Sequence, residues 1–148
     1  MGHLVRIYDK TKGLDRPLRS VIRRSVKQVL SAESVDEVCL VEVTAIDELA
    51  MAALNKRTRN VDAVTDVLSF PMGEFDLETE RFALGDVLLC LPVIMRQAEA
   101  LRQSLVRELA YMTVHSVLHL LGYDHMDDAE KLAMREREKL IMKELGHL

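Results

Sequence analysis

Three of the five histidines of this 148-residue chain fall within the eleven residues HSVLHLLGYDH, which run from His115 to His125. The segment before Gly122 has helical apolar periodicity, so His115 and His119 lie one turn apart and both imidazoles can face one point. Gly122 can adopt the left-handed conformation that ends a helix, which lets the chain turn back and bring His125 to that point. The spacing therefore predicts a helix that ends near Leu121, with three imidazoles beside its last turn.

Three neutral imidazoles in this arrangement suit Zn²⁺, and we expect one ion per chain held by His115, His119 and His125. Zinc is tetrahedral, so three protein ligands leave a fourth position for water. Water in that position can ionise near neutral pH. The pattern therefore favours a catalytic zinc site over a closed structural one.

The spacing H-x-x-x-H-x-x-G-x-x-H is also that of the metzincin proteases, so a zinc peptidase is an alternative. Those enzymes carry a glutamate directly after the first histidine as general base. Here that position is Ser116, whose hydroxyl is not basic near pH 7. A peptidase mechanism of the usual kind would lack its base.

The remaining pattern predicts an α+β fold, with a single layer of mixed β-sheet, about five helices, and the metal site at the end of a buried helix. Alternation and β-branched runs predict strands over 4–8, 38–44, 64–70 and 84–91. Apolar periodicity predicts helices over about 15–30, 46–54, 92–102 and 104–121, and a last one from about 127. Their expected capping residues are Asp15, then Thr44 or Asp47, then Ser104, and Asp127 or Asp128. The acidic segment PMGEFDLETER (71–81) is expected to be an exposed hairpin connection.

The length and the absence of a repeat or linker predict one metal-dependent domain over residues 1–148. No apolar run approaches the roughly 20 residues of a membrane span, and the first residues have no signal-peptide core. We therefore expect a cytoplasmic protein without membrane contact. Cys39 and Cys90 lie in apolar runs and are expected to be buried hydrophobes, and His3 and His147 have no partner at ligand spacing.

Charge is distributed unevenly along the chain. The net charge is −4, yet residues 1–30 hold eight Lys/Arg against two Asp, a sum of +6 that leaves −10 for the rest. Four of these cations follow one another at steps of three or four residues and form a basic stripe on the first helix: Arg16, Arg19, Arg23 and Lys27. This basic stripe is either a solvated helix face or an RNA contact.

Three blocks that cover most of residues 54–126 resemble the YbeY family of bacterial rRNA maturation factors, in the family's order: LNKRTRNVDAVTDVLSFP, LGDVLLC and RELAYMTVHSVLHLLGYDH. The family signature H-x-x-x-H-x-x-G-x-D-H is complete here, with Asp124 included. Thr58 and Val64 depart from positions that are usually aromatic and Pro. The resemblance implies an α+β fold, a bound zinc, and metal-dependent cleavage of single-stranded RNA in small-subunit rRNA processing and ribosome quality control. Its expected partners are single-stranded RNA, ribosomal RNA, and the ribosome or ribosomal proteins.

The resemblance also implies that Arg59 works beside the metal. A guanidinium can hold the charged phosphate oxygens of a phosphodiester in two hydrogen bonds, so Arg59 and His115 are the expected catalytic residues. Arg59 would also bind RNA. Lys56 and Arg57 could extend that phosphate path or simply be solvated.

The roles of three aspartates remain open. Asp124 could orient a ligand imidazole or cap the following turn, while Asp66 and Asp86 could be structural acceptors or lie near the site. The base that activates water is not identified.

A third function is also open. Besides the endoribonuclease and the peptidase, the chain could be a non-catalytic ribosome-associated factor whose zinc only holds the fold together.

Overall fold

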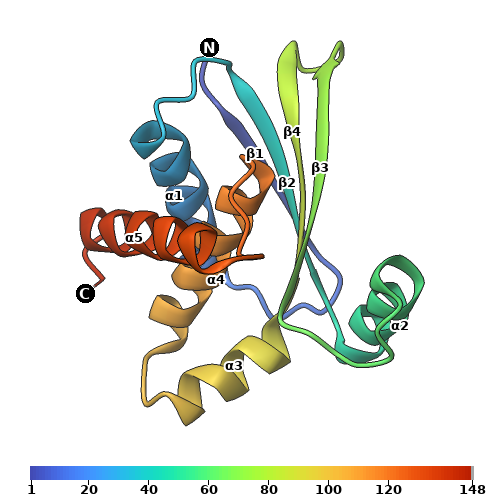
Figure 1. The fold of residues 1–148 in the computed structure, drawn as a ribbon. Coiled ribbons are helices and arrows are strands. Elements are labelled where there is room, and N and C mark those ends of the chain that lie inside the picture. Colours follow the sequence, from blue (N-terminus) through green and yellow to red (C-terminus); the bar gives the residue numbers. More distant parts are fainter. Residues whose placement is uncertain (148) are drawn as a thin grey trace.

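A mixed four-stranded sheet with five helices makes up the computed structural model, which describes residues 1–147 (Figure 1). The fold class is therefore α+β, as predicted. The elements in chain order are β1 (Leu4–Asp9), α1 (Arg16–Ala32), β2 (Cys39–Ile46), α2 (Glu48–Arg59), β3 (Val67–Asp76), β4 (Arg81–Cys90), α3 (Leu91–Ala100), α4 (Leu105–Leu120) and α5 (Asp128–Glu144).

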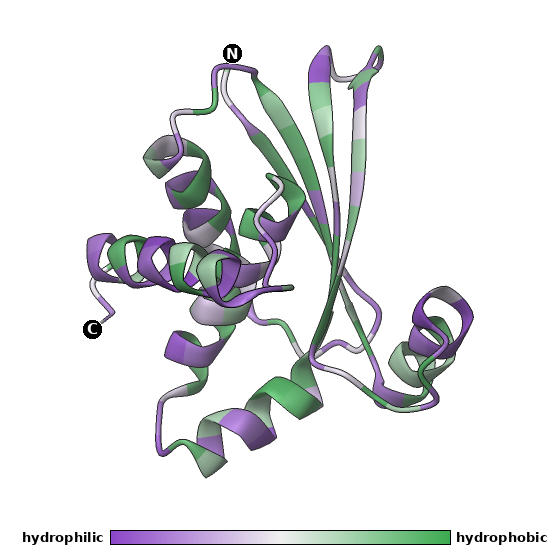
Figure 2. Ribbon diagram, viewed as in Figure 1, coloured by the Kyte–Doolittle hydropathy of each residue, from purple (hydrophilic) through white to green (hydrophobic). Residues whose placement is uncertain are grey.

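The sheet has the strand order β1-β2-β4-β3. β1 and β4 each run parallel to β2, and β3 is antiparallel to β4 at the edge. Alternate residues of β2 (Val41, Val43 and Ala45) are fully buried, as expected for the face of a sheet that helices cover. Figure 2 shows hydrophobic residues along the central strands, whereas α5 carries many hydrophilic ones.

Short polar side chains begin four of the helices, as their sequence positions predict. Asp15, Asp47, Ser104 and Asp127 each accept a hydrogen bond from a backbone N–H in the first turn of α1, α2, α4 and α5. Asp47, not Thr44, is the cap of α2. Because α2 continues to Arg59, the basic residues of this segment belong to its last turn.

The prediction for the hairpin was wrong in extent. Segment 71–81 is mostly strand, because β3 runs to Asp76, β4 begins at Arg81, and only residues 77–80 form the turn. β3 is an edge strand whose residues 71–75 are exposed, so they do not need hydrophobic alternation to pair with β4. A register shift between Pro71 and Glu74 accommodates the proline there.

Helix α4 lies at the centre of the molecule and is buried along most of its length, as predicted. It packs against α1, α3, α5 and β3, and Val114, Val117 and Leu118 are fully buried. Cys39 and Cys90 are buried too. Among the described residues, no helix combines the length and apolar character needed to cross a membrane.

Candidate metal centre

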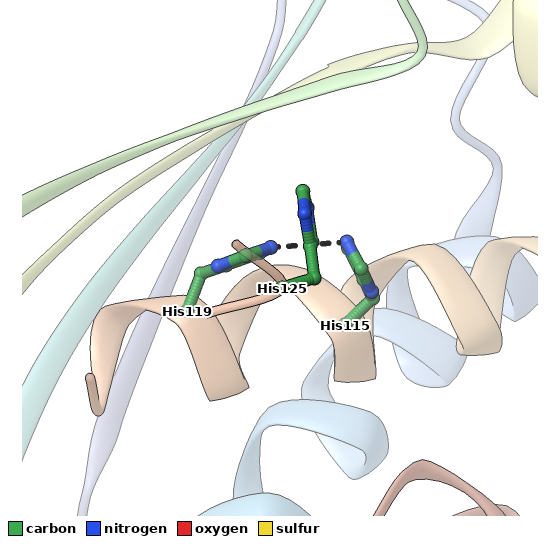
Figure 3. A group of neighbouring side chains, drawn as sticks. All are labelled: His115, His119 and His125. Carbon is green, nitrogen blue, oxygen red and sulfur yellow. Dashed lines mark hydrogen bonds between the residues drawn. The ribbon is translucent and has the colours of Figure 1, made fainter. Parts of the chain in front are cut away.

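The three histidines predicted as ligands converge at the C-terminal end of α4 (Figure 3). His115 and His119 lie on consecutive turns of the helix, and His125 lies in the loop that follows Gly122, whose φ is 103°. One nitrogen of each imidazole lies within 4.8 Å of the others. Gly122 thus has the positive φ that was expected of it, and the loop brings the third imidazole back over the helix.

Hydrogen bonds orient the two helical imidazoles. His119 Nδ1 lies 2.8 Å from the backbone oxygen of Tyr123, and His115 Nδ1 lies 2.5 Å from Glu138 Oε2. Since a carbonyl and a carboxylate accept, the Nδ1 atoms donate and each Nε2 keeps a lone pair. Burial lowers the pKa of His119, and the neighbouring His115 adds to this effect, so His119 favours its neutral form.

This donor set fits a zinc ion. The two Nε2 atoms lie 3.1 Å apart, and with both Nδ1 atoms protonated their lone pairs face each other, an arrangement that a cation between them would stabilise. Two imidazole nitrogens on one tetrahedral Zn²⁺ are separated by roughly 3.3 Å, given Zn–N bonds of about 2.0–2.1 Å. The exposed His125 completes a set of three nitrogens, the number typical of open zinc sites.

Glu138 is a residue of this candidate site that the sequence did not reveal. It lies on α5, 4% exposed, and its carboxylate accepts from His115 Nδ1 through one oxygen and from the Tyr111 hydroxyl, at 3.0 Å, through the other. A carboxylate in this place fixes the tautomer and orientation of a ligand imidazole. Nothing local marks Glu138, because α5 is rich in charged residues and the contact depends on how α5 packs across α4.

A second hydrogen-bond network anchors the loop that carries His125. The Tyr123 hydroxyl donates to Glu33 Oε1 at 2.5 Å, and Arg137 Nε donates to Glu33 Oε2 at 2.7 Å. Arg137 also donates to the backbone oxygen of Ala32 at the end of α1. The loop is therefore tied to both α1 and α5, and the Tyr123 backbone oxygen that receives His119 is held in place.

The histidines line a hollow of about 510 Å³ between the end of α4 and β3, here called the histidine cleft. Arg59, Asp66 and Ser69 are among the other residues that line it. One guanidinium nitrogen of Arg59 donates to the backbone oxygen of Ser69 at 3.0 Å. Its Cζ lies 5.6 Å from the centre of the Phe70 ring. Arg59, 56 residues before the first histidine, is thus held beside the three imidazoles.

Ser116, where a metzincin has its glutamate, is fully buried. Its hydroxyl contacts the hydroxyl of Ser69, and its backbone oxygen accepts from the same Ser69 hydroxyl at 3.3 Å. The serine thus links α4 to β3.

The aspartates left open by the sequence have different places. Asp124 lines the histidine cleft and accepts from the backbone N–H of the next residue, His125, at 2.7 Å. Asp66 lies at the rim of the histidine cleft and accepts from Gln97 at 3.0 Å. Asp86 lies on β4 opposite Glu42 of β2. Burial and the Glu42 charge raise the pKa of Asp86.

The other predicted RNA contacts lie outside the histidine cleft. Lys56 and Arg57 are exposed on α2, and Lys56 is 3.8 Å from Asp62. None of the basic stripe residues of α1 is among the described residues that line the cleft. Arg19 donates to the backbone oxygen of Leu14. His3, which lies outside the cleft as well, accepts from the backbone N–H of Cys39.

Comparisons with known proteins show the family to which the chain belongs. The model of the Endoribonuclease YbeY family matches residues 5–146. A protein named Endoribonuclease YbeY from Caldanaerobacter subterraneus is 40% identical, with 87% of this chain and 88% of that one covered. One of the same name from Pelotomaculum thermopropionicum is 41% identical, with 90% of each chain covered. A solution structure of a Thermotoga maritima protein has a TM-score of 0.65 at 28% identity, and covers 95% of this chain and 88% of that one. This chain belongs to the Endoribonuclease YbeY family.

Proposed function

We propose that this chain is a zinc-dependent endoribonuclease that cleaves single-stranded RNA in the cytoplasm, in small-subunit ribosomal RNA maturation and ribosome quality control. One observation carries the proposal: Arg59 and the three histidines line the same cleft. A metal centre beside a fixed guanidinium suits phosphodiester hydrolysis, since negative charge grows on the phosphate oxygens in the transition state. Membership of an endoribonuclease family supports RNA as the substrate.

In this mechanism the protein positions and neutralises charge. His115, His119 and His125 would hold the ion, and Zn²⁺, when bound, supplies a Lewis acid that polarises the phosphate and acidifies water. Arg59 donates one N–H to the Ser69 carbonyl. Its other N–H groups remain to donate hydrogen bonds to two phosphate oxygens. Glu138 keeps the His115 ring oriented. Asp124 accepts a hydrogen bond from the backbone of His125.

The two alternative functions have less support. A peptidase would need a base at the position of Ser116, which is buried against Ser69. A purely structural zinc would be enclosed by four protein ligands, whereas His125 is exposed and the three imidazoles face an open cleft. The rRNA and ribosome roles follow from the family resemblance.

Arg59→Glu, with Arg57→Glu as its matched control, tests the proposal. Both residues lie in the last turn of α2, both are exposed, and only Arg59 lines the histidine cleft. With zinc content and melting temperature unchanged, we expect Arg59→Glu to lower the rate of cleavage of an unstructured RNA by about a hundredfold or more. Arg57→Glu should keep most of the activity.

Wild-type protein loaded with zinc should cut unstructured RNA, stop on chelation, and spare a casein-like peptide substrate. Two results would overturn the mechanism: intact RNA after incubation with the zinc-loaded wild type, or an Arg59→Glu variant as fast as wild type. Cleavage of the peptide would favour the peptidase instead.

A further inference from the structure

A second hollow, larger than the histidine cleft, lies between α4 and α5 next to the end of α3, where α5 crosses α4 (Figure 1). Its volume is about 690 Å³, within the range of sites that hold a small organic ligand. We call it the α4–α5 hollow. The mechanism above does not use it.

Four cations from two helices surround the α4–α5 hollow: Arg107 of α4, and Arg135, Lys139 and Lys143 of α5. The three on α5 follow at steps of four residues and so share one face of the helix. Among the described residues, none of the four forms an ion pair. Arg137 on the same helix, in contrast, is paired with Glu33. The positive charge of these four side chains is therefore available to bind an anion, although the net charge of the whole chain is −4.

The two acidic residues that line the hollow are buried, whereas the three cations of α5 are exposed. Glu108 and Glu138 are 3% and 4% exposed. Both oxygens of Glu138 are occupied by Tyr111 and His115. Burial, followed by the charge of Asp66, raises the pKa of Glu108. Tyr111 and Met142 add an apolar and aromatic surface to the lining.

The α4–α5 hollow borders the metal centre. Tyr111 is one helical turn before His115, and the two ring centres are 6.1 Å apart. Glu138 lines the hollow and contacts the ligand His115 itself. When one phosphate of an RNA chain lies at the histidines, a neighbouring nucleotide of the same RNA can therefore reach the hollow.

We propose that the α4–α5 hollow binds the nucleotides that flank the cleaved bond on the same single-stranded RNA, with their phosphates on the four cations and a base against Tyr111 and Met142. Cations beside an aromatic face are the combination with which proteins bind single strands without reading their sequence. The inference rests on the proposed function, because it takes RNA as the substrate of the neighbouring cleft.

Charge reversal in the hollow tests the proposal. The double variant Arg135→Glu/Lys139→Glu is compared with Lys131→Glu, which reverses an exposed charge on the same helix outside the hollow. Binding is measured by fluorescence anisotropy with zinc-free protein and a labelled unstructured RNA of about 12 nucleotides, within the usual span of a single-strand site. The double variant should bind roughly tenfold more weakly, and its log–log salt slope should fall by about 0.7 for each lost phosphate contact. Lys131→Glu should change neither by a comparable amount.

A dinucleotide with a single phosphodiester separates this site from the catalytic one. Its only phosphate is the one that is cleaved, so it offers none to the four cations, and the zinc-loaded double variant should cut it as fast as wild type. Unchanged zinc content and melting temperature show that the variant is folded. Equal RNA affinity in the double variant and wild type would overturn the proposal, as would an equal loss in Lys131→Glu. If wild type cut no RNA while the double variant still lost affinity, the proposed function would fail and the binding site would stand.

Discussion

The histidine cleft and the α4–α5 hollow lie next to each other along α4, yet their side chains are held in opposite ways. In the cleft, His115, His119 and Arg59 are each hydrogen-bonded to a fixed partner. In the hollow, Arg135, Lys139 and Lys143 are exposed and free of ion pairs among the described residues. Chemistry needs groups fixed to a fraction of an ångström, whereas binding a flexible strand tolerates mobile charges. The difference predicts that mutations in the cleft change metal content and rate, and mutations in the hollow change affinity.

Replacing the proposed metal ligands should have the largest effect. A variant with His115, His119 and His125 all changed to Ala should lose its zinc, measured by elemental analysis of the purified protein, and all RNA cleavage. Because the ligands join only a helix end to a loop, its melting temperature should equal that of chelated wild type and lie modestly below the zinc-loaded form.

The RNA affinity of the same triple variant tests the comparison between the histidine cleft and the α4–α5 hollow. If the two regions have separate tasks, its RNA binding should stay near that of zinc-free wild type. Equal zinc in the variant and wild type would contradict the ligand assignment.

Glu138→Gln should have the next largest effect, and it acts where the two regions meet. The amide keeps the shape of the side chain but loses the charge that orients His115 Nδ1, so zinc affinity should fall by about 10–100-fold in competition with a chelator. Co²⁺ substituted for zinc should show an altered visible spectrum, which a merely destabilised protein would not. Glu136→Gln, at an exposed position of the same helix, is the control. Unchanged zinc affinity would show that Glu138 only packs α5 against α4.

The basic stripe of α1 should matter less for RNA affinity than the hollow. Arg19→Glu/Arg23→Glu reverses the same number of charges as the double variant in α5, but neither residue lines either hollow. Its effect should be a loss of about threefold or less, through long-range attraction that salt screens. A larger loss than that of Arg135→Glu/Lys139→Glu would move the RNA path to α1.

The sequence was sufficient to predict those features that depend only on residues close to one another along the chain. The histidine spacing, Gly122, and the capping residues Asp15 and Ser104 depend on residues within one or two turns, and each lies as predicted. The α+β class followed from the same local patterns.

Features that depend on packing between distant segments were missed. Glu138 is 23 residues after His115, and no periodicity tells which face of α5 covers α4. The hollow also needs Arg107 to meet three residues of α5. The length of the β3–β4 hairpin could not be predicted either, because residues 71–75 of the edge strand are exposed and therefore carry no strand pattern in their hydrophobicity.

The smallest expected effect concerns Tyr123, which belongs to the predicted loop but acts through a contact that the sequence did not reveal. Tyr123→Phe removes the hydrogen bond to Glu33 while Arg137 keeps its own bond to the same carboxylate. A hydrogen bond to a charged, partly exposed group contributes about 1 kcal/mol, so the free energy of unfolding of the zinc-free protein in urea should fall by about that amount. Zinc affinity should change by less than about twofold, because the backbone oxygen that receives His119 remains. A loss of zinc affinity as large as that of Glu138→Gln would mean that the loop, and not the carboxylate, fixes the metal centre.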